Sequence, residues 1–140
     1  MSKRIYISPS WAFHDDRGDA LNPQLFTLLN RIKETGKLTK AAALANISYR
    51  HGWNLLDQAH QFFGSPVVHL EKGRGATLSP LGEKLLWAEQ RVAARLTPQM
   101  ENLASELNIE IHKEIADLSP ILRLHASHGY AVALLPDYAL

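Results

Sequence analysis

Residues 36–56 read GKLTKAAALANISYRHGWNLL, and this stretch decides the fold. The alanine-rich run after Thr39 favours a short helix with Thr39 as its N-cap. Asn46 stands where a tight turn needs a residue that tolerates a left-handed backbone. Ser48 then supplies a second N-cap and opens a second helix at Tyr49. The pattern predicts a helix-turn-helix.

Small residues allow these two helices to approach closely. Ala42 and Gly52 are the small pair, and we expect Ile47, Trp53 and Leu56 to face the core. The side chains left facing outward at the start of the second helix are Tyr49, Arg50, His51 and Asn54. A recognition helix presents this end to base edges in the major groove. Paired amphipathic helices also occur in proteins that never touch DNA, so the motif alone leaves both interpretations open.

The next segment predicts a β-hairpin. Residues 66–70 and 77–79 have strand-like composition, and residues 71–76 between them are rich in glycine. A hairpin directly after a recognition helix is typical of a wing. Its tip carries Lys72 and Arg74, and the glycines beside Arg74 would let the backbone approach another surface, such as a minor groove or its phosphates. The alternatives are a plain soluble turn and a phosphate-binding loop. The strand-to-helix context that is usual for a phosphate-binding loop is absent here.

The chain before this motif predicts a strand and a helix. Residues 3–13 alternate in polarity as a strand does, and residues 14–19 form a polar turn. Asn22 and Pro23 give an N-cap and a first helical residue, and Gly36 ends the helix. Its apolar face consists of Leu25, Leu28, Leu29 and Ile32.

A long amphipathic helix follows the hairpin, starting at Ser79 or Pro80. Its apolar stripe contains Leu85, Ala88, Val92, Leu96, Met100, Leu103, Leu107, Ile111 and Ile115. The average spacing of about 3.75 residues exceeds that of a heptad and favours a nearly straight or slightly right-handed seam. We interpret the stripe as a homodimer interface; the alternative is packing on a further domain of the same chain. Pro98 kinks this helix or starts a second one capped by Thr97, and the unbroken stripe favours a kink.

Charge and composition narrow the functional class. The net charge is +1, but residues 1–95 carry 13 basic and 8 acidic side chains, whereas residues 96–140 carry 2 and 6. The basic excess lies in the half with the helix-turn-helix, as in DNA-binding domains. The absence of cysteine excludes disulfides, and no membrane span or signal peptide is evident, so we expect a cytoplasmic protein. No catalytic constellation, metal site or cofactor site is predicted in this chain.

From residue 28 to about residue 86 the sequence resembles the winged helix-turn-helix of the molybdate-responsive ModE regulators, and more loosely that of LysR-type regulators. The resemblance rests on ANISYRHGW at residues 45–53 and GRGATLSPLGEKLL at residues 73–86. It implies a homodimer on a palindromic operator, joined by the helix after the wing. Asn46 departs from the glycine usual at the turn, and Pro98 departs from an uninterrupted linker helix.

The C-terminal residues change character. Residues 121–126 predict a strand and residues 129–135 the start of a helix, which is too little for a core. This segment resembles the opening of periplasmic-binding-protein-like effector domains. The resemblance implies that Ser127, just after the strand, donates to an oxyanion such as molybdate or tungstate in the parent protein.

The sequence therefore predicts a mainly α protein with a small β wing. Residues 1–80 form the winged helix-turn-helix, residues 81–117 the dimerisation helix, and residues 118–140 the first βα unit of an effector domain. The expected function is sequence-specific transcription regulation as a homodimer on double-stranded DNA. Phosphate and wing contacts are assigned to Lys37, Thr39, Lys40, Ser48, Lys72 and Arg74, and the dimer interface to Leu85, Val92, Leu96, Met100, Leu103, Leu107 and Ile111. The alternative is a winged-helix protein-interaction and oligomerisation module without DNA binding.

Overall fold

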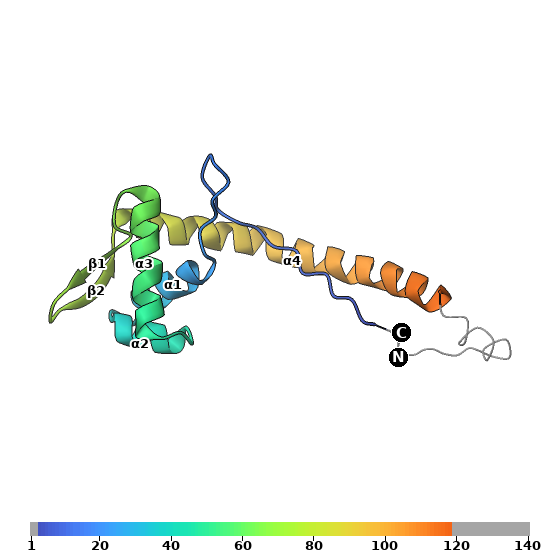
Figure 1. Ribbon diagram of the computed structural model, residues 1–140, viewed down its shortest axis with the longest axis horizontal. Coiled ribbons are helices and arrows are strands. Elements are labelled where there is room, and N and C mark those ends of the chain that lie inside the picture. Colours follow the sequence, from blue (N-terminus) through green and yellow to red (C-terminus); the bar gives the residue numbers. More distant parts are fainter. Residues whose placement is uncertain (1–2, 119–140) are drawn as a thin grey trace. The chain divides into compact units, whose positions relative to one another are not determined.

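The computed structural model describes residues 3–118, which form four helices and one hairpin (Figure 1). The elements are α1 (Gln24–Thr35), α2 (Leu38–Leu44), α3 (Tyr49–Phe63), β1 (Val68–Glu71), β2 (Gly75–Leu78) and α4 (Pro80–Asp117). The chain divides into two compact units: residues 11–94, and residues 3–10 together with the chain from residue 95. The predicted fold class, mainly helical with a two-stranded wing, is confirmed. The elements predicted within residues 119–140, with Ser127, lie outside the described residues.

Helix α1 forms the centre of the core of residues 11–94. Its predicted apolar face is fully buried, with at most 1% exposure at Leu25, Leu28, Leu29 and Ile32. The helix begins at Gln24 with Pro23 at the cap position, one residue later than predicted, and Asn22 Oδ1 accepts the backbone N–H of Gln24 at 2.9 Å. Gly36 ends it in a left-handed conformation, φ 72°, and donates its N–H to the carbonyl of Ile32. Gly36 therefore confirms the predicted end of the helix.

The helix-turn-helix is formed by α2 and α3, which pack on α1 and on each other. Asn46 adopts a left-handed backbone with φ 62°, as predicted for the turn. Ser48 Oγ accepts the N–H of His51 at 3.0 Å and so caps α3. A Cβ atom added at Gly52 would lie 3.5 Å from Ala42 Cβ, which confirms the close packing of the two helices.

Two predictions inside this motif are wrong. Thr39 is not an N-cap, because α2 begins one residue earlier, at Leu38, and Lys37 occupies the cap position without a side-chain hydrogen bond. This start buries Leu38, which is 5% exposed. Trp53 does not face the core and is 44% exposed, whereas Leu55 is 2% exposed. The buried residues of α3 follow helical spacing, and Trp53 falls outside that stripe.

The wing is an antiparallel pair, β1 with β2, in which Val68 faces Leu78 and Glu71 faces Gly75. The hairpin is attached to the α1–α2 junction, because the N–H of Ala76 donates to the carbonyl of Gly36 at 2.8 Å. A Cβ atom at Gly75 would collide with that same carbonyl oxygen. The close approach expected from this glycine is therefore made to the chain's own α1–α2 junction.

Ser79 joins the wing to α4. It is 4% exposed; its Oγ donates to the carbonyl of Pro66 at 2.8 Å and accepts the N–H of Gly82 at 3.1 Å. This confirms the predicted start of the long helix. Helix α4 runs without interruption through Pro98, so no second helix starts at Thr97.

The predicted strand at residues 3–13 is wrong, since no strand is formed there. Within the unit that contains residues 3–10, the N–H of Ile5 donates to His112 Nε2 of α4 at 3.2 Å rather than to a strand. Phe13 belongs to the other unit and packs its ring on Phe26, with 5.0 Å between centroids. The predicted polar turn forms, with Asp15 Oδ1 accepting two backbone N–H groups. Ile5 and Phe13 therefore contact helices and do not form the strand-to-strand hydrogen bonds that the alternating polarity of residues 3–13 suggested.

Candidate nucleic-acid interface

The outward face of α3 begins with polar side chains. The opposite face of the helix is buried through Gly52, Leu55, Leu56 and Ala59. Tyr49 is 53% exposed, and Arg50 and Asn54 are also exposed. Arg50 forms no ion pair within residues 3–118, so its guanidinium donors are available to a partner.

His51 is placed differently from its neighbours. Its Nε2 lies 2.6 Å from the side-chain oxygen of Gln24, the first residue of α1, and the residue is half-buried. The ring therefore links the start of α3 to α1. Its assignment as a base-contacting residue stays a prediction. Only the ring edge that does not bond to Gln24 would be able to contact a base.

The predicted phosphate-contacting lysines are exposed and unpaired. Among the described residues, Lys37, Lys40 and Lys72 form no ion pair. Arg74 is 82% exposed and lies 3.9 Å from Glu71, which is a weak surface ion pair. Thr39 and Ser48 are exposed too, although Ser48 Oγ already accepts the capping bond.

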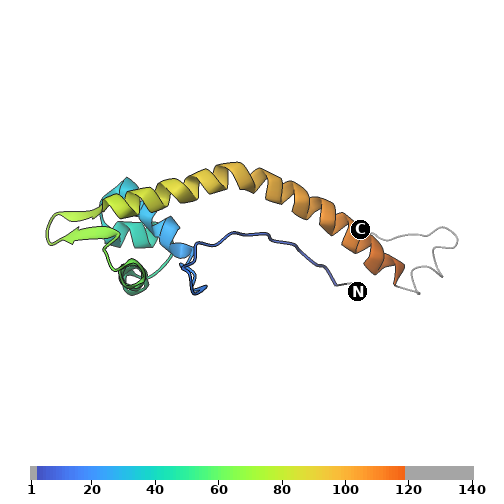
Figure 2. The ribbon, with the colours of Figure 1, turned by 90° about the horizontal axis from the view of Figure 1, so that it is seen from above.

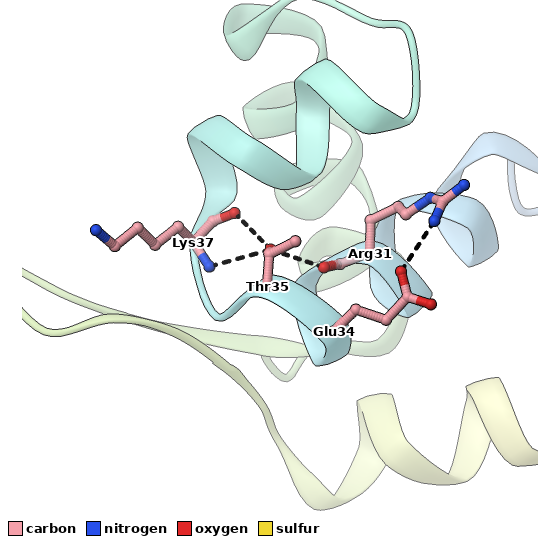
Figure 3. A network of polar contacts seen from close by, with 4 residues as sticks. All are labelled: Arg31, Glu34, Thr35 and Lys37. Carbon is pink, nitrogen blue, oxygen red and sulfur yellow. Dashed lines mark hydrogen bonds and ion pairs between the residues drawn. The ribbon is translucent and has the colours of Figure 1, made fainter.

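Thr35 organises the junction that presents Lys37 (Figure 3). Its Oγ1 lies 2.7 Å from the carbonyl oxygen of Arg31 and 3.2 Å from that of Lys37, and it accepts the N–H of Lys37 at 3.3 Å. The side chain of Lys37 points away from these contacts. Arg31 pairs with Glu34 at 2.9 Å. Sequence reasoning missed Thr35, whose only signal was a hydroxyl side chain directly before the helix-ending Gly36.

The hairpin tip projects beyond α1, α2 and α3 in both views (Figures 1 and 2). Residues 71–74 at this tip are all exposed. A projecting basic tip beside an outward-facing helix start is the geometry with which winged helices contact a duplex.

The apolar stripe of α4 is divided between two environments. Leu85 packs against the core of residues 11–94. Farther along, Leu96, Leu103 and Leu107 are 39%, 50% and 40% exposed, while Val92, Met100 and Ile111 are half-buried. The later part of the stripe thus leaves a row of apolar side chains open to solvent.

Two other kinds of site, a metal site and a membrane span, find no support in the described part of the chain. Residues 3–118 contain no group of three or more His, Asp or Glu side chains placed to hold a metal ion. None of their helices combines the length and the apolar character that crossing a membrane requires.

Comparison with solved structures defines the class of fold. The DNA complex of Vibrio fischeri DarR matches 63% of this chain and 30% of its own, with a TM-score of 0.53 and 11% identity. The DNA complex of the CbnR DNA-binding domain matches 60% of this chain and 95% of its own, with a TM-score of 0.52 and 14% identity. Full-length LysG from Corynebacterium glutamicum matches 62% of this chain and 30% of its own, with a TM-score of 0.50 and 24% identity. The fold is a winged helix-turn-helix similar to that of these three structures.

Comparison with curated proteins points to molybdenum-related relatives, although no family model matches the chain. The molybdenum-pterin-binding protein MopB of Rhodobacter capsulatus is 28% identical over 118 residues, covering 81% of this chain and 43% of the relative. The molybdenum transport protein ModE of Herbaspirillum seropedicae is 32% identical over 75 residues, covering 49% and 28%. The chain thus spans less than half the length of these relatives. Fold and sequence together support the resemblance to ModE-type and LysR-type winged helix-turn-helix proteins.

Proposed function

We propose that this chain is the DNA-binding part of a transcription regulator that acts as a homodimer on a palindromic operator. The observation that carries the proposal is the first turn of α3, whose polar side chains face outward beside a projecting, basic wing. Both elements are fixed to one core, α3 through the Ser48 cap and the wing through the hydrogen bond from Ala76 to Gly36. Solved structures with a similar fold include two complexes with DNA.

Affinity and specificity come from different side chains in this proposal. Lys37, Lys40, Lys72 and Arg74 contact phosphates, so binding weakens steeply as salt rises. Tyr49, Arg50, His51 and Asn54 meet base edges in the major groove, where arginine pairs best with guanine and asparagine with adenine. Thr39 and Ser48 stand at the edge of this surface and contact the sugar-phosphate backbone.

The exposed row on α4 supplies the dimer contact. Leu96, Met100, Leu103, Leu107 and Ile111 meet the same residues of a second copy, and burial of this row removes apolar surface from water. Two recognition helices related by a two-fold axis then face two half-sites of a palindrome.

The parent protein is regulated by an oxyanion of the molybdate or tungstate type. This part of the proposal rests on the molybdenum-related relatives and on the position of Ser127 in the sequence. Ser127 would donate a hydrogen bond to the anion within a complete effector domain.

Replacing Arg50 by alanine is expected to change sequence preference. The bidentate contact of an arginine with guanine contributes about 1–3 kcal/mol of discrimination, so the ratio of operator to scrambled-DNA affinity should fall roughly tenfold.

Replacing Lys72 by alanine should weaken binding to both duplexes about equally and should lower the salt dependence by about one phosphate contact. Fluorescence anisotropy titrations on both duplexes at several salt concentrations measure these effects.

The two variants serve as controls for each other, because both residues are exposed and unpaired within residues 3–118. An unchanged affinity ratio in Arg50→Ala would remove Arg50 from the base-contacting set. Absence of binding to any duplex, together with a stable dimer, would favour the protein-interaction module instead.

A further inference from the structure

Trp53 occupies the outward face of the recognition helix. It lies four residues after Tyr49 and three after Arg50, so it shares their side of α3. Its side chain is 44% exposed, while the buried stripe of the helix runs through Gly52, Leu55, Leu56 and Ala59. Large aromatic side chains supply much of the contact area of interfaces, and the exposed surface of Trp53 is available to a duplex bound at this face.

Trp53 also borders the start of the wing. Trp53 helps to line a hollow of about 120 Å³ between α3 and the start of the hairpin. Its other walls are Leu56, Asp57, His60, Pro66, Val67, Val68 and Leu70. The exposed indole thus lies on the wing side of α3, one turn after the proposed base-contacting residues Tyr49 and Arg50.

A second exposed tryptophan, Trp87, has partners within the chain. Trp87 of α4 is 49% exposed, and Lys84 and Arg91 lie over its ring at 4.7 and 4.8 Å from the centroid. Trp53 has no such cation and no stacked ring among the described residues. Its exposed surface therefore lacks the contact that Trp87 has.

The chemistry of the indole selects the feature that it contacts. An indole offers a single donor, Nε1–H, and is otherwise apolar, so it does not match the paired donors and acceptors of most base edges. The apolar group in the major groove is the C5-methyl of thymine. We propose that Trp53 is a specificity-determining residue that packs against the C5-methyl of a thymine in each operator half-site. This inference rests on the proposed function, and it adds a base class and a residue to it.

The test replaces thymine by deoxyuridine, which keeps base pairing and removes only the methyl group. An operator recovered by selection from random duplexes is substituted at one thymine position at a time, and affinity is measured for the wild type, Trp53→Ala and Trp87→Ala. At one thymine per half-site, the wild type and Trp87→Ala should lose about fourfold in affinity per methyl, equivalent to ~0.8 kcal/mol. Trp53→Ala should bind the thymine and deoxyuridine operators equally at that position.

Two outcomes overturn the inference while leaving the proposed function intact. One is a wild type that binds its operator but responds to no deoxyuridine substitution. The other is a Trp53→Ala variant that keeps the full deoxyuridine loss. A wild type that binds no duplex refutes the proposed function itself. The wild-type scan needs no variant, and alanine at an exposed helical position favours helix formation, which circular dichroism verifies.

Discussion

Replacing Gly75 by alanine is expected to lower the free energy of unfolding by about 3 kcal/mol. Gly75 has a φ of 96°, and a left-handed backbone costs a side-chain-bearing residue roughly 1 kcal/mol. The added Cβ would also collide with the carbonyl oxygen of Gly36, a backbone atom that cannot rotate away. Such overpacking adds about 2 kcal/mol. Urea unfolding followed by circular dichroism measures the loss.

Gly73→Ala is the matched control for this variant. Gly73 lies in the same hairpin with a φ of 79°, but nothing lies within 4 Å of a Cβ atom placed there. It should cost only about 1 kcal/mol, for the backbone conformation alone. Equal losses in the two variants would show that the wing does not pack against the α1–α2 junction.

Replacing Leu103 and Leu107 together by glutamate is expected to convert the proposed dimer to a monomer. Both side chains are exposed on the apolar stripe of α4, and two carboxylates on each copy would be desolvated and would repel one another across the contact. Affinity for a palindromic operator should fall about 100-fold or more, because the second half-site no longer binds intramolecularly. Affinity for a single half-site should be unchanged. Sedimentation equilibrium and operator titration give the two readouts.

Ile109→Glu provides a control on the same helix. Ile109 is 56% exposed, and it follows Leu107 by two residues, which places it on roughly the opposite side of α4. This variant should remain dimeric and keep its operator affinity. If Leu103 and Leu107 tolerate glutamate and the dimer persists, the contact between copies lies elsewhere.

Local signals predicted most of the winged helix correctly. Asn46, Ser48 and Gly36 each mark a backbone conformation or a cap that depends on the residue itself and its immediate neighbours. The apolar spacing of α1 also identified its buried face, because helical periodicity is a local property. These features need no knowledge of distant contacts.

The incorrect predictions concern features that depend on contacts between residues far apart in the sequence. The alternation in residues 3–13 suits a strand, but a strand needs a partner, and within the described chain Ile5 bonds to His112 instead. Trp53 was assigned to the core from its hydrophobicity, whereas the register of α3 on α1 is set by Leu55, Leu56 and Ala59. Gly75 was expected to let the backbone approach another surface, whereas in the structure it lies against the Gly36 carbonyl, 39 residues away in the sequence.

In the proposed function, two copies of this winged helix bind one palindromic duplex in a sequence-specific manner. Selection of bound sites from random duplexes, followed by sequencing, tests it most directly. We predict an enriched inverted repeat whose half-sites are about one helical turn, or a multiple of it, apart. Recovery of no enriched sequence, or of a single asymmetric site, would contradict the account.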